Sequence, residues 1–414
     1  MEVLHILIAP NAFKNSLDAE GVALAIRDGL ERSALSCTCE TFPIGDGGDG
    51  TGELIIKKCA GVLVTGDVHD ALGREIEADF GLIDAGAGTT GASFGLIDAA
   101  AGTIDAAKAD ADEPAAAAGK TAVIEMANAS GLRLLKLSEL DPLRANSFGT
   151  GEQIRLALDK GARKIIIGMG GSATVDGGVG ILKALGVCFL DENGEELPTL
   201  PGDLVRLVTI DVSGLDHRIA DCEVIVLCDV DNLLLGEDGA AAVFGPQKGA
   251  TPATLPQLEA ALRQLAEVTF RQTGKDIATL RHGGTAGGAA AGLYAFLDAK
   301  LVNGIDYFLE LTGFEAALEE ADLVITGEGS IDEQTLQGKG PFGVARQAKL
   351  KGLPVIGVAG KVPLVKDPGL QRYFDVLVAI GNGPADLATA FKSTTENLVR
   401  TAWEMGNLLA IGRR

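Results

Sequence analysis

Short apolar runs alternate with amphipathic stretches along most of the chain, a pattern that predicts strands and helices in turn. A first strand is expected at residues 3–8. An amphipathic helix is expected at 16–30, with Ser16 as its N-cap, because apolar residues recur there at helical spacing. Later strands are expected at 323–326, 355–358 and 376–380, each followed by glycine. Strands separated by helices are typical of a parallel sheet that binds ligands at the carboxyl ends of its strands.

The two ends of the chain are expected to build one domain, because the N-terminal strand needs neighbours and the C-terminal strands can supply them. The predicted fold class is α/β, with two α/β domains and an active site in the cleft between them. One domain is a Rossmann- or flavodoxin-like parallel sheet formed by residues 1–65 and 300–414. Residues 66–299 form a second α/β domain that is inserted between these two segments. A chain of 414 residues is long enough for both cores.

An internal repeat interrupts this alternation. Residues 80–89, FGLIDAGAGT, recur as residues 94–103, FGLIDAAAGT. Two copies are too few for a solenoid, so the repeat is interpreted as a local duplication that adds a hairpin to the edge of a sheet.

Composition narrows the range of functions. The net charge of −22 repels nucleic acids and anionic membrane surfaces, and the apolar run at the N-terminus is too short for a signal peptide or a membrane span. The six cysteines contain no CxxC pair, and the four histidines show no metal-ligand spacing, which argues against a zinc enzyme and against a serine or cysteine hydrolase. We therefore expect a cytoplasmic monomer or homodimer that acts on a small molecule and binds neither nucleic acid nor membrane.

The glycine-rich stretch GMGGSATVDGG, residues 168–178, follows an apolar strand and exposes mostly backbone N–H groups, which bind anions. Residues 168–173 fit the GxGxxA turn of a dinucleotide-binding fold, with Asp191 in the place of the ribose-binding acid. The glycines that follow Asp176 disfavour the helix which that turn requires, and they favour a longer loop around phosphates. Asp176 also fits the N-cap of the next helix. The chain has no GxxxxGK[ST] motif, which excludes a P-loop NTPase.

Carboxylates gather at loops that follow predicted strands, in a pattern that suits phosphoryl transfer. Asp229 and Asp231 are two residues apart, so on an extended segment they face the same way and could hold a divalent cation. Lys14 is the best-placed lysine for a substrate carboxylate or a phosphate, and Lys248 and Lys339 are the next candidates. The carboxylate clusters are Asp46 with Asp49, Asp229 with Asp231, Glu328 with Asp332, and Asp306 alone.

Taken together, these stretches resemble the bacterial glycerate kinase family of the type that is unrelated to P-loop and hexokinase-like kinases. The matching blocks, in chain order, are APNAFKNSL at 9–17, GDGGDGT at 45–51, IEMANASGL at 124–132, FGTGEQI at 148–154, GMGGSATVDGGVG at 168–180, CDVDNLLLG at 228–236, AAAVFGPQKGA at 240–250 and ADLVITGEGSIDEQTLQGKGP at 321–341. The resemblance implies ATP-dependent phosphorylation of D-glycerate, with Mg²⁺, on a two-domain α/β scaffold. The chain departs from the pattern at Asn11 and Ala12, where many relatives have Asp-Ser, and at Val175, Leu233 and Ser330, where asparagine, proline and arginine are common.

Specific roles follow as hypotheses. The ATP phosphates are expected against Gly170, Gly171, Ser172 and Thr174, with Mg²⁺ near Asp176, Asp229 and Asp231. Asp176 or Asp46 is expected to take the proton from a glycerate hydroxyl. Glycerate is expected to be gripped by Lys14, Ser16, Glu328, Asp332 and Asp306. The family favours 2-phosphoglycerate over 3-phosphoglycerate as product. An NAD(P)-dependent oxidoreductase that uses the turn at 168–173 remains the alternative.

Overall fold

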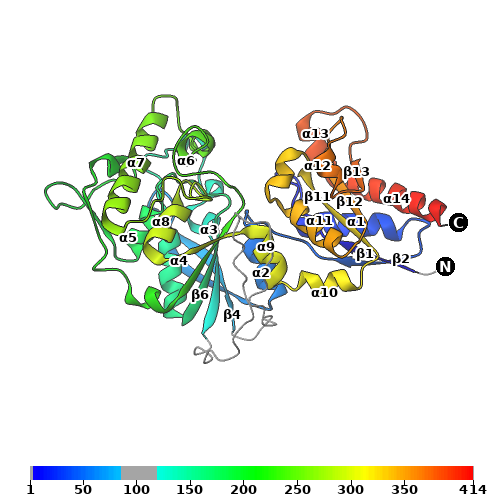
Figure 1. Cartoon of the computed structure of the whole chain (residues 1–414), viewed down its shortest axis with the longest axis horizontal. Coiled ribbons are helices and arrows are strands. Elements are labelled where there is room, and N and C mark those ends of the chain that lie inside the picture. The colour runs from blue at the N-terminus through cyan, green and yellow to red at the C-terminus, as the bar shows by residue number, and fades with distance from the viewer. Residues whose placement is uncertain (1–2, 85–118, 414) are drawn as a thin grey trace.

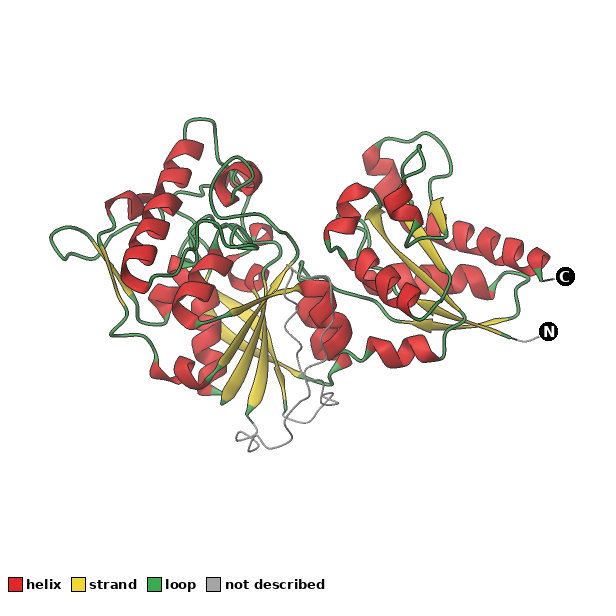
Figure 2. Cartoon of the chain, viewed as in Figure 1, coloured by secondary structure: helices red, strands yellow, loops and turns green. Residues whose placement is uncertain are grey.

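The computed structural model describes residues 3–84 and 119–413, which form two α/β units lying side by side. Each unit has its own sheet with helices around it (Figure 2). Both termini lie at the outer end of one unit, and the middle of the chain forms the other (Figure 1). The predicted α/β class, with one parallel sheet built from both chain ends, is confirmed.

The unit that carries the termini contains five parallel strands in the order β13–β12–β11–β1–β2. The strands are β1 (Leu4–Ile8), β2 (Cys37–Thr41), β11 (Leu323–Ser330), β12 (Val355–Lys361) and β13 (Val376–Ala379). Strand β1 lies between β2 and β11, with Ile6 opposite Leu323. The N-terminal strand therefore sits inside a sheet that the C-terminal strands complete.

Helices cover both faces of this sheet, because successive side chains of a strand point to opposite sides. Ile6 and Ile8 of β1 face α1 (Ala19–Glu31) and α14 (Thr394–Gly412), which pack on one another. Leu7 faces the opposite side, where it shares a core with Val344 of α11 (Gly340–Leu350). The remaining helices of this unit are α10 (Phe314–Glu319), α12 (Pro368–Gln371) and α13 (Leu387–Lys392).

The second unit is built on a six-stranded mixed sheet in the order β10–β9–β6–β5–β4–β3. Its strands are β3 (Val62–His69), β4 (Glu75–Ile83), β5 (Lys120–Glu125), β6 (Ala162–Gly168), β9 (Glu223–Cys228) and β10 (Lys300–Asn303). The first four strands in this order are parallel, while β4 and β3 form an antiparallel edge. A separate antiparallel ribbon joins β7 (Cys188–Leu190) to β8 (Thr209–Asp211).

Eight helices among the described residues surround this second sheet. They are α2 (Thr51–Lys58), α3 (Met126–Ser130), α4 (Phe148–Asp159), α5 (Val179–Ala184), α6 (Ala240–Phe244), α7 (Leu255–Thr273), α8 (Ala289–Leu297) and α9 (Gly304–Leu311). One face is covered by α4, α5, α7 and α8, whose apolar side chains share the largest core of the described residues. Helices α2 and α9 cover the other face, and they lie between the two units (Figure 1).

Strand β10 and helix α2 indicate that the boundaries between the two units differ from those suggested by the sequence. Strand β10 pairs with β9 in the six-stranded sheet, although the sequence suggested that residues from 300 onward belong to the other unit. Helix α2 also packs on β4 and β5 of the six-stranded sheet, before the suggested boundary at 65. We propose that the chain crosses between the units near residue 45 and again near 312. Local patterns do not reveal this, because strand pairing is a long-range property.

Two local expectations change in the structure. The first helix begins at Ala19 rather than at Ser16, and its N-cap is Asp18, whose Oδ1 accepts the Gly21 N–H at 2.7 Å. The first four residues of the 80–103 repeat end strand β4, and most of the repeat lies outside the described residues. In the described part of the chain, no helix is both long and apolar enough to cross a membrane.

Candidate active site

A polar cavity of about 880 Å³ opens between the two units. It is lined by loops that follow strands β1, β2, β6 and β9, so it lies where the carboxyl ends of parallel strands from both sheets meet. Its charged residues come from segments far apart in the sequence: Lys14, Asp18, Asp46, Asp49, Asp229 and Lys248. The tertiary structure thus brings together several of the loops that the sequence singled out.

Asp46 is buried at the base of this cavity. Its Oδ2 accepts a hydrogen bond from the Asn11 amide at 2.8 Å, and its Oδ1 accepts the Gly48 N–H at 3.2 Å. An aspartate at position 11 would face Asp46 with a second negative charge, whereas the Asn11 amide stabilises the ionised carboxylate. Asn11 belongs to the first unit, so this bond also links the units.

Asp229 lies in the same cavity, next to Asp46. Burial raises the pKa of Asp229, the negative charge of Asp46 raises it further, and Lys14 and Lys339 oppose the rise. Two neighbouring carboxylates repel one another, and a divalent cation would relieve that repulsion. Mg²⁺ is commonly held by one or two carboxylates together with substrate phosphates, so Asp46 and Asp229 fit such an ion. Among the described residues, no group of three or more His, Cys, Asp or Glu side chains is arranged to hold a metal.

Glu328 lies near the end of strand β11 in the first unit. It is not among the residues that line the cavity, but it lies close enough to Lys14 and Asp46 of the lining for their charges to affect it. Burial raises the pKa of Glu328 to about 7; Lys339, a hydrogen bond from Thr335 and Lys14 lower it, and Asp46 raises it. The Thr335 hydroxyl donates to Oε1 at 2.9 Å. A carboxyl group with a pKa near neutrality is suited to accept a proton at physiological pH.

The glycine-rich loop after β6 forms one wall of the cavity through Gly170, Gly171 and Ser172. A side chain at Gly170 would place its Cβ 2.4 Å from the Asp49 nitrogen and 2.5 Å from the Gly48 backbone, so only glycine fits between these loops. The Gly170 N–H already donates to Gly47 at 3.1 Å. Within the described chain, the N–H groups of Gly171 and Ser172 donate to no other group, and they remain available to an anion.

Asp176 does not reach the cavity. It is fully buried, and its carboxylate accepts four hydrogen bonds. The donors are the Ser147 N–H at 2.8 Å, the Ser147 hydroxyl at 2.7 Å, the Gly178 N–H at 3.0 Å and the Gly180 N–H at 3.1 Å. Full burial outside the cavity lining, together with these four bonds, argues against the predicted roles of Asp176 as base and as metal ligand. The residue fastens the start of α5 to the start of α4.

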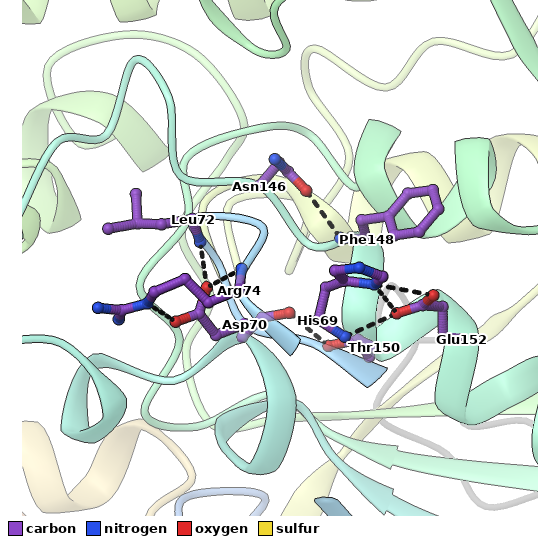
Figure 3. Close-up of polar contacts among 9 residues, drawn as sticks. His69, Asp70, Leu72, Arg74, Asn146, Phe148, Thr150 and Glu152 are labelled. Carbon is purple, nitrogen blue, oxygen red and sulfur yellow. Dashed lines mark hydrogen bonds and ion pairs between the residues drawn. The ribbon is translucent and has the colours of Figure 1, made fainter. Parts of the chain in front are cut away.

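The segment that carries Ser147 is itself braced, as Figure 3 shows. The Asn146 Oδ1 accepts the Phe148 N–H at 3.0 Å, and Glu152 of α4 accepts the His69 N–H at 2.8 Å (Figure 3). The Thr150 hydroxyl pairs with that of Ser130 at 2.8 Å. The end of strand β3 and the start of α4 therefore hold Ser147, the partner of Asp176, in place.

Lys248 is the buried cation of the site, with 3% of its surface exposed. Its Nζ donates to the Ser172 hydroxyl at 2.9 Å and to the Thr174 carbonyl at 2.7 Å. Burial lowers the pKa of Lys248 to about 7, while the charges of Asp176 and Asp229 oppose this effect. The sequence ranked this lysine behind Lys14, because nothing local to GPQKG reveals that it reaches back to the glycine-rich loop.

Several predicted residues do not contribute a free group to the cavity. Asp306 pairs with Arg346 of α11, and Asp231 pairs with Arg281 at 3.0 Å and is not among the residues that line the cavity. Asp332 caps its own turn by accepting the Gln334 N–H at 3.0 Å.

Ser16 lines the cavity, but its hydroxyl donates to the Phe391 carbonyl. Thr174 is fully buried and lies outside the lining. A long-range partner takes the group of Asp306, Asp231 and Ser16, burial removes that of Thr174, and a local turn takes that of Asp332.

The dinucleotide interpretation is wrong. In the described part of the chain, strand β7, which precedes Asp191, forms an antiparallel ribbon with β8 and is not part of the sheet that contains β6, where the second strand of a dinucleotide-binding fold would lie. The Asp191 carboxylate is also occupied, since it accepts the Asn193 N–H at 2.8 Å and pairs with Arg206 at 2.7 Å. It closes a turn and offers nothing to a ribose.

Two α/β units with carboxylates, ammonium groups and free backbone N–H groups in the cavity between them define an enzyme that acts on small anionic substrates. Comparison with known proteins agrees. The profile of the glycerate kinase family matches residues 6–410. The chain is 39% identical to a glycerate kinase of Bacillus subtilis and 40% identical to a glycerate 2-kinase of Escherichia coli, with 99% of each chain covered. It belongs to the glycerate kinase family.

The likeness extends to a solved structure. The crystal structure of a protein provisionally named glycerate kinase 2, from Salmonella typhimurium LT2, aligns over 100% of both chains with a TM-score of 0.77 and 40% sequence identity. The resemblance noted in the sequence is confirmed, and so is the enzyme class: the chain is a kinase whose phosphoryl donor is ATP and whose acceptor is glycerate.

Proposed function

We propose that the chain phosphorylates the 2-hydroxyl of D-glycerate with ATP and Mg²⁺ and releases 2-phosphoglycerate. The observation that carries this proposal is the composition of the cavity. The cavity is lined by a loop with free backbone N–H groups, by Lys14 from the other unit, and by Asp46 and Asp229. These are the groups that phosphoryl transfer requires: an anion cradle, metal-binding carboxylates and a cation for the acceptor.

The phosphates of ATP bind against the N–H groups of Gly171 and Ser172. Asp46 and Asp229 would hold Mg²⁺, which would offset the negative charge of the phosphates. The carboxylates are suited to this role because they share a cavity and interact through their charges.

Lys14 pairs with the carboxylate of glycerate, since it is an exposed cation at the edge of the cavity and lies close enough to Asp229 and Glu328 to influence both. Glu328 accepts the proton from the glycerate hydroxyl as the phosphoryl group is transferred. Its Oε1 is held by Thr335, which leaves Oε2 for the substrate. This assignment replaces Asp176 as base and retains Asp46 as a residue of the site.

The test is a coupled assay that separates the two isomeric products. The enzyme is incubated with D-glycerate and ATP·Mg²⁺, and enolase is then added without phosphoglycerate mutase. Prompt formation of phosphoenolpyruvate supports 2-phosphoglycerate as product. A signal that appears only after mutase is added would show transfer to the 3-hydroxyl, and the absence of ADP would refute the proposal as a whole.

A further inference from the structure

Lys248 stands apart from every other lysine and arginine in the described residues, because it is the only one that is buried. It also lines the cavity. An ammonium group has three N–H donors, and the described residues accept two of them, at the Ser172 hydroxyl and the Thr174 carbonyl. The third donor is free for a ligand.

The charge of Lys248 has no direct partner in the described part of the chain. The carboxylates whose charges act on it are Asp176 and Asp229, and no ion pair joins either to the Nζ. Asp176 is saturated by four other donors. A buried charge without a partner is costly, and an anion in the cavity would offset that cost.

Lys248 lies next to the loop that offers the free N–H groups. Because the Ser172 hydroxyl accepts from Lys248, its own hydrogen is free to donate elsewhere. The N–H groups of Gly171 and Ser172, the Ser172 hydroxyl and the ammonium thus belong to one compact cluster, which matches the several oxygens of a phosphate better than a single carboxylate. Lys14 reaches the cavity from the other unit, and its charge lowers the pKa of Glu328.

We propose that Lys248 binds a phosphate group of the nucleotide, while Lys14 serves glycerate. The proposal rests on the proposed function in one respect, since it takes ATP as the donor. The division of labour between the two lysines is new, and it makes Lys248 a nucleotide-binding residue rather than a mere support of the glycine-rich loop.

The test compares Lys248→Met with Lys14→Met, both checked for folding by circular dichroism. Binding of ADP·Mg²⁺ and of inorganic triphosphate is measured by calorimetry without glycerate. For Lys248→Met we expect a loss of at least ~10-fold in affinity for both ligands, as for a charge-assisted hydrogen bond, and a KM for glycerate within about 3-fold of wild type. Lys14→Met should show the reverse split.

Unchanged affinity for ADP and triphosphate in folded Lys248→Met would overturn the proposal. An equal rise of both KM values would also overturn it, because that result indicates a structural role. If the methionine variant does not fold, Lys248→Gln, which keeps N–H donors for Ser172 and Thr174 but lacks the charge, is judged by the same criteria. Failure of the proposed function would be distinct: wild-type protein would bind ADP normally and transfer no phosphate to glycerate.

Discussion

At the scale of single residues, the pKa of a buried carboxyl group sets an expected pH profile. Burial raises the pKa of Glu328 to about 7, and only the ionised form can accept a proton. At saturating substrates, kcat should therefore be low below pH 7 and rise as the pH increases through about 7. Glu328→Gln should lower kcat by ~10²–10⁴-fold and abolish the rising limb.

The matched control for this experiment is Glu333→Gln, an exposed carboxylate in the next turn that should leave the profile unchanged. Steady-state rates from about pH 5.5 to 9 measure both effects. A Glu328→Gln variant that keeps the wild-type pH limb would show that another group takes the proton.

Asp176 tests whether a buried carboxylate without access to substrate affects stability rather than catalysis. An asparagine there has only one oxygen that can accept a hydrogen bond, and its NH₂ group would point at N–H donors with which it cannot bond. Asp176→Asn should lower the free energy of unfolding by about 2 kcal/mol, measured by urea denaturation. The kcat of the folded variant should stay within about tenfold of wild type, far from the loss expected for a base. A folded variant that loses ~10³-fold in kcat would restore Asp176 to the chemistry.

At the scale of elements, the position of the glycine-rich loop depends on close backbone contact. A methyl group at residue 170 would lie 2.4–2.5 Å from the backbone of Gly48 and Asp49, so Gly170→Ala must push the two loops apart. Because both loops line the cavity, we expect kcat/KM to fall on the order of 10²-fold.

The control for Gly170→Ala is Gly383→Ala, where an added Cβ has open space and no positive φ. It should retain wild-type kinetics. Measured KM values for ATP and glycerate that stay unchanged in Gly170→Ala would mean that this loop does not bind substrate.

At the scale of the whole molecule, two units with separate sheets share one active-site cavity and part of one core. Leu7 of the first sheet and Ile166 and Ile225 of the second belong to a single apolar cluster, which extends through the helices between the units. The cavity is lined by four aspartates, Asp18, Asp46, Asp49 and Asp229, and by two lysines. An anionic nucleotide would add to this negative charge, and a divalent cation would offset it.

The excess of negative charge in the cavity predicts that activity depends on Mg²⁺ and that Asp229 affects the Mg²⁺ concentration that is required. Asp229→Asn should raise the Mg²⁺ concentration for half-maximal activity by about tenfold, because one of two ligand carboxylates is lost. Asp231→Asn is the matched control, since its carboxylate pairs with Arg281 at the surface and such pairs contribute little. Magnesium titrations of initial rates would contradict the assignment if both variants behaved alike.

The sequence alone determined the class of fold, the joining of both chain ends in one sheet, and the loops that carry the chemistry. It could do so because hydrophobic periodicity and turn-forming residues act over a few positions, and eight collinear blocks match one family. The repeat at 80–103 was the main pattern whose structural role the described residues do not address.

Only the tertiary structure decided which side chains face the cavity. Asp231 and Asp306 were taken out of the predicted site by Arg281 and Arg346, which lie 50 and 40 residues further along the chain. Lys248 entered it by reaching Ser172, 76 residues away. Burial and pairing depend on such distant neighbours, whereas a sequence pattern reports only what lies nearby. The sequence predicted which loops lie at the site, and the packing of the two sheets determined which of their side chains face the cavity.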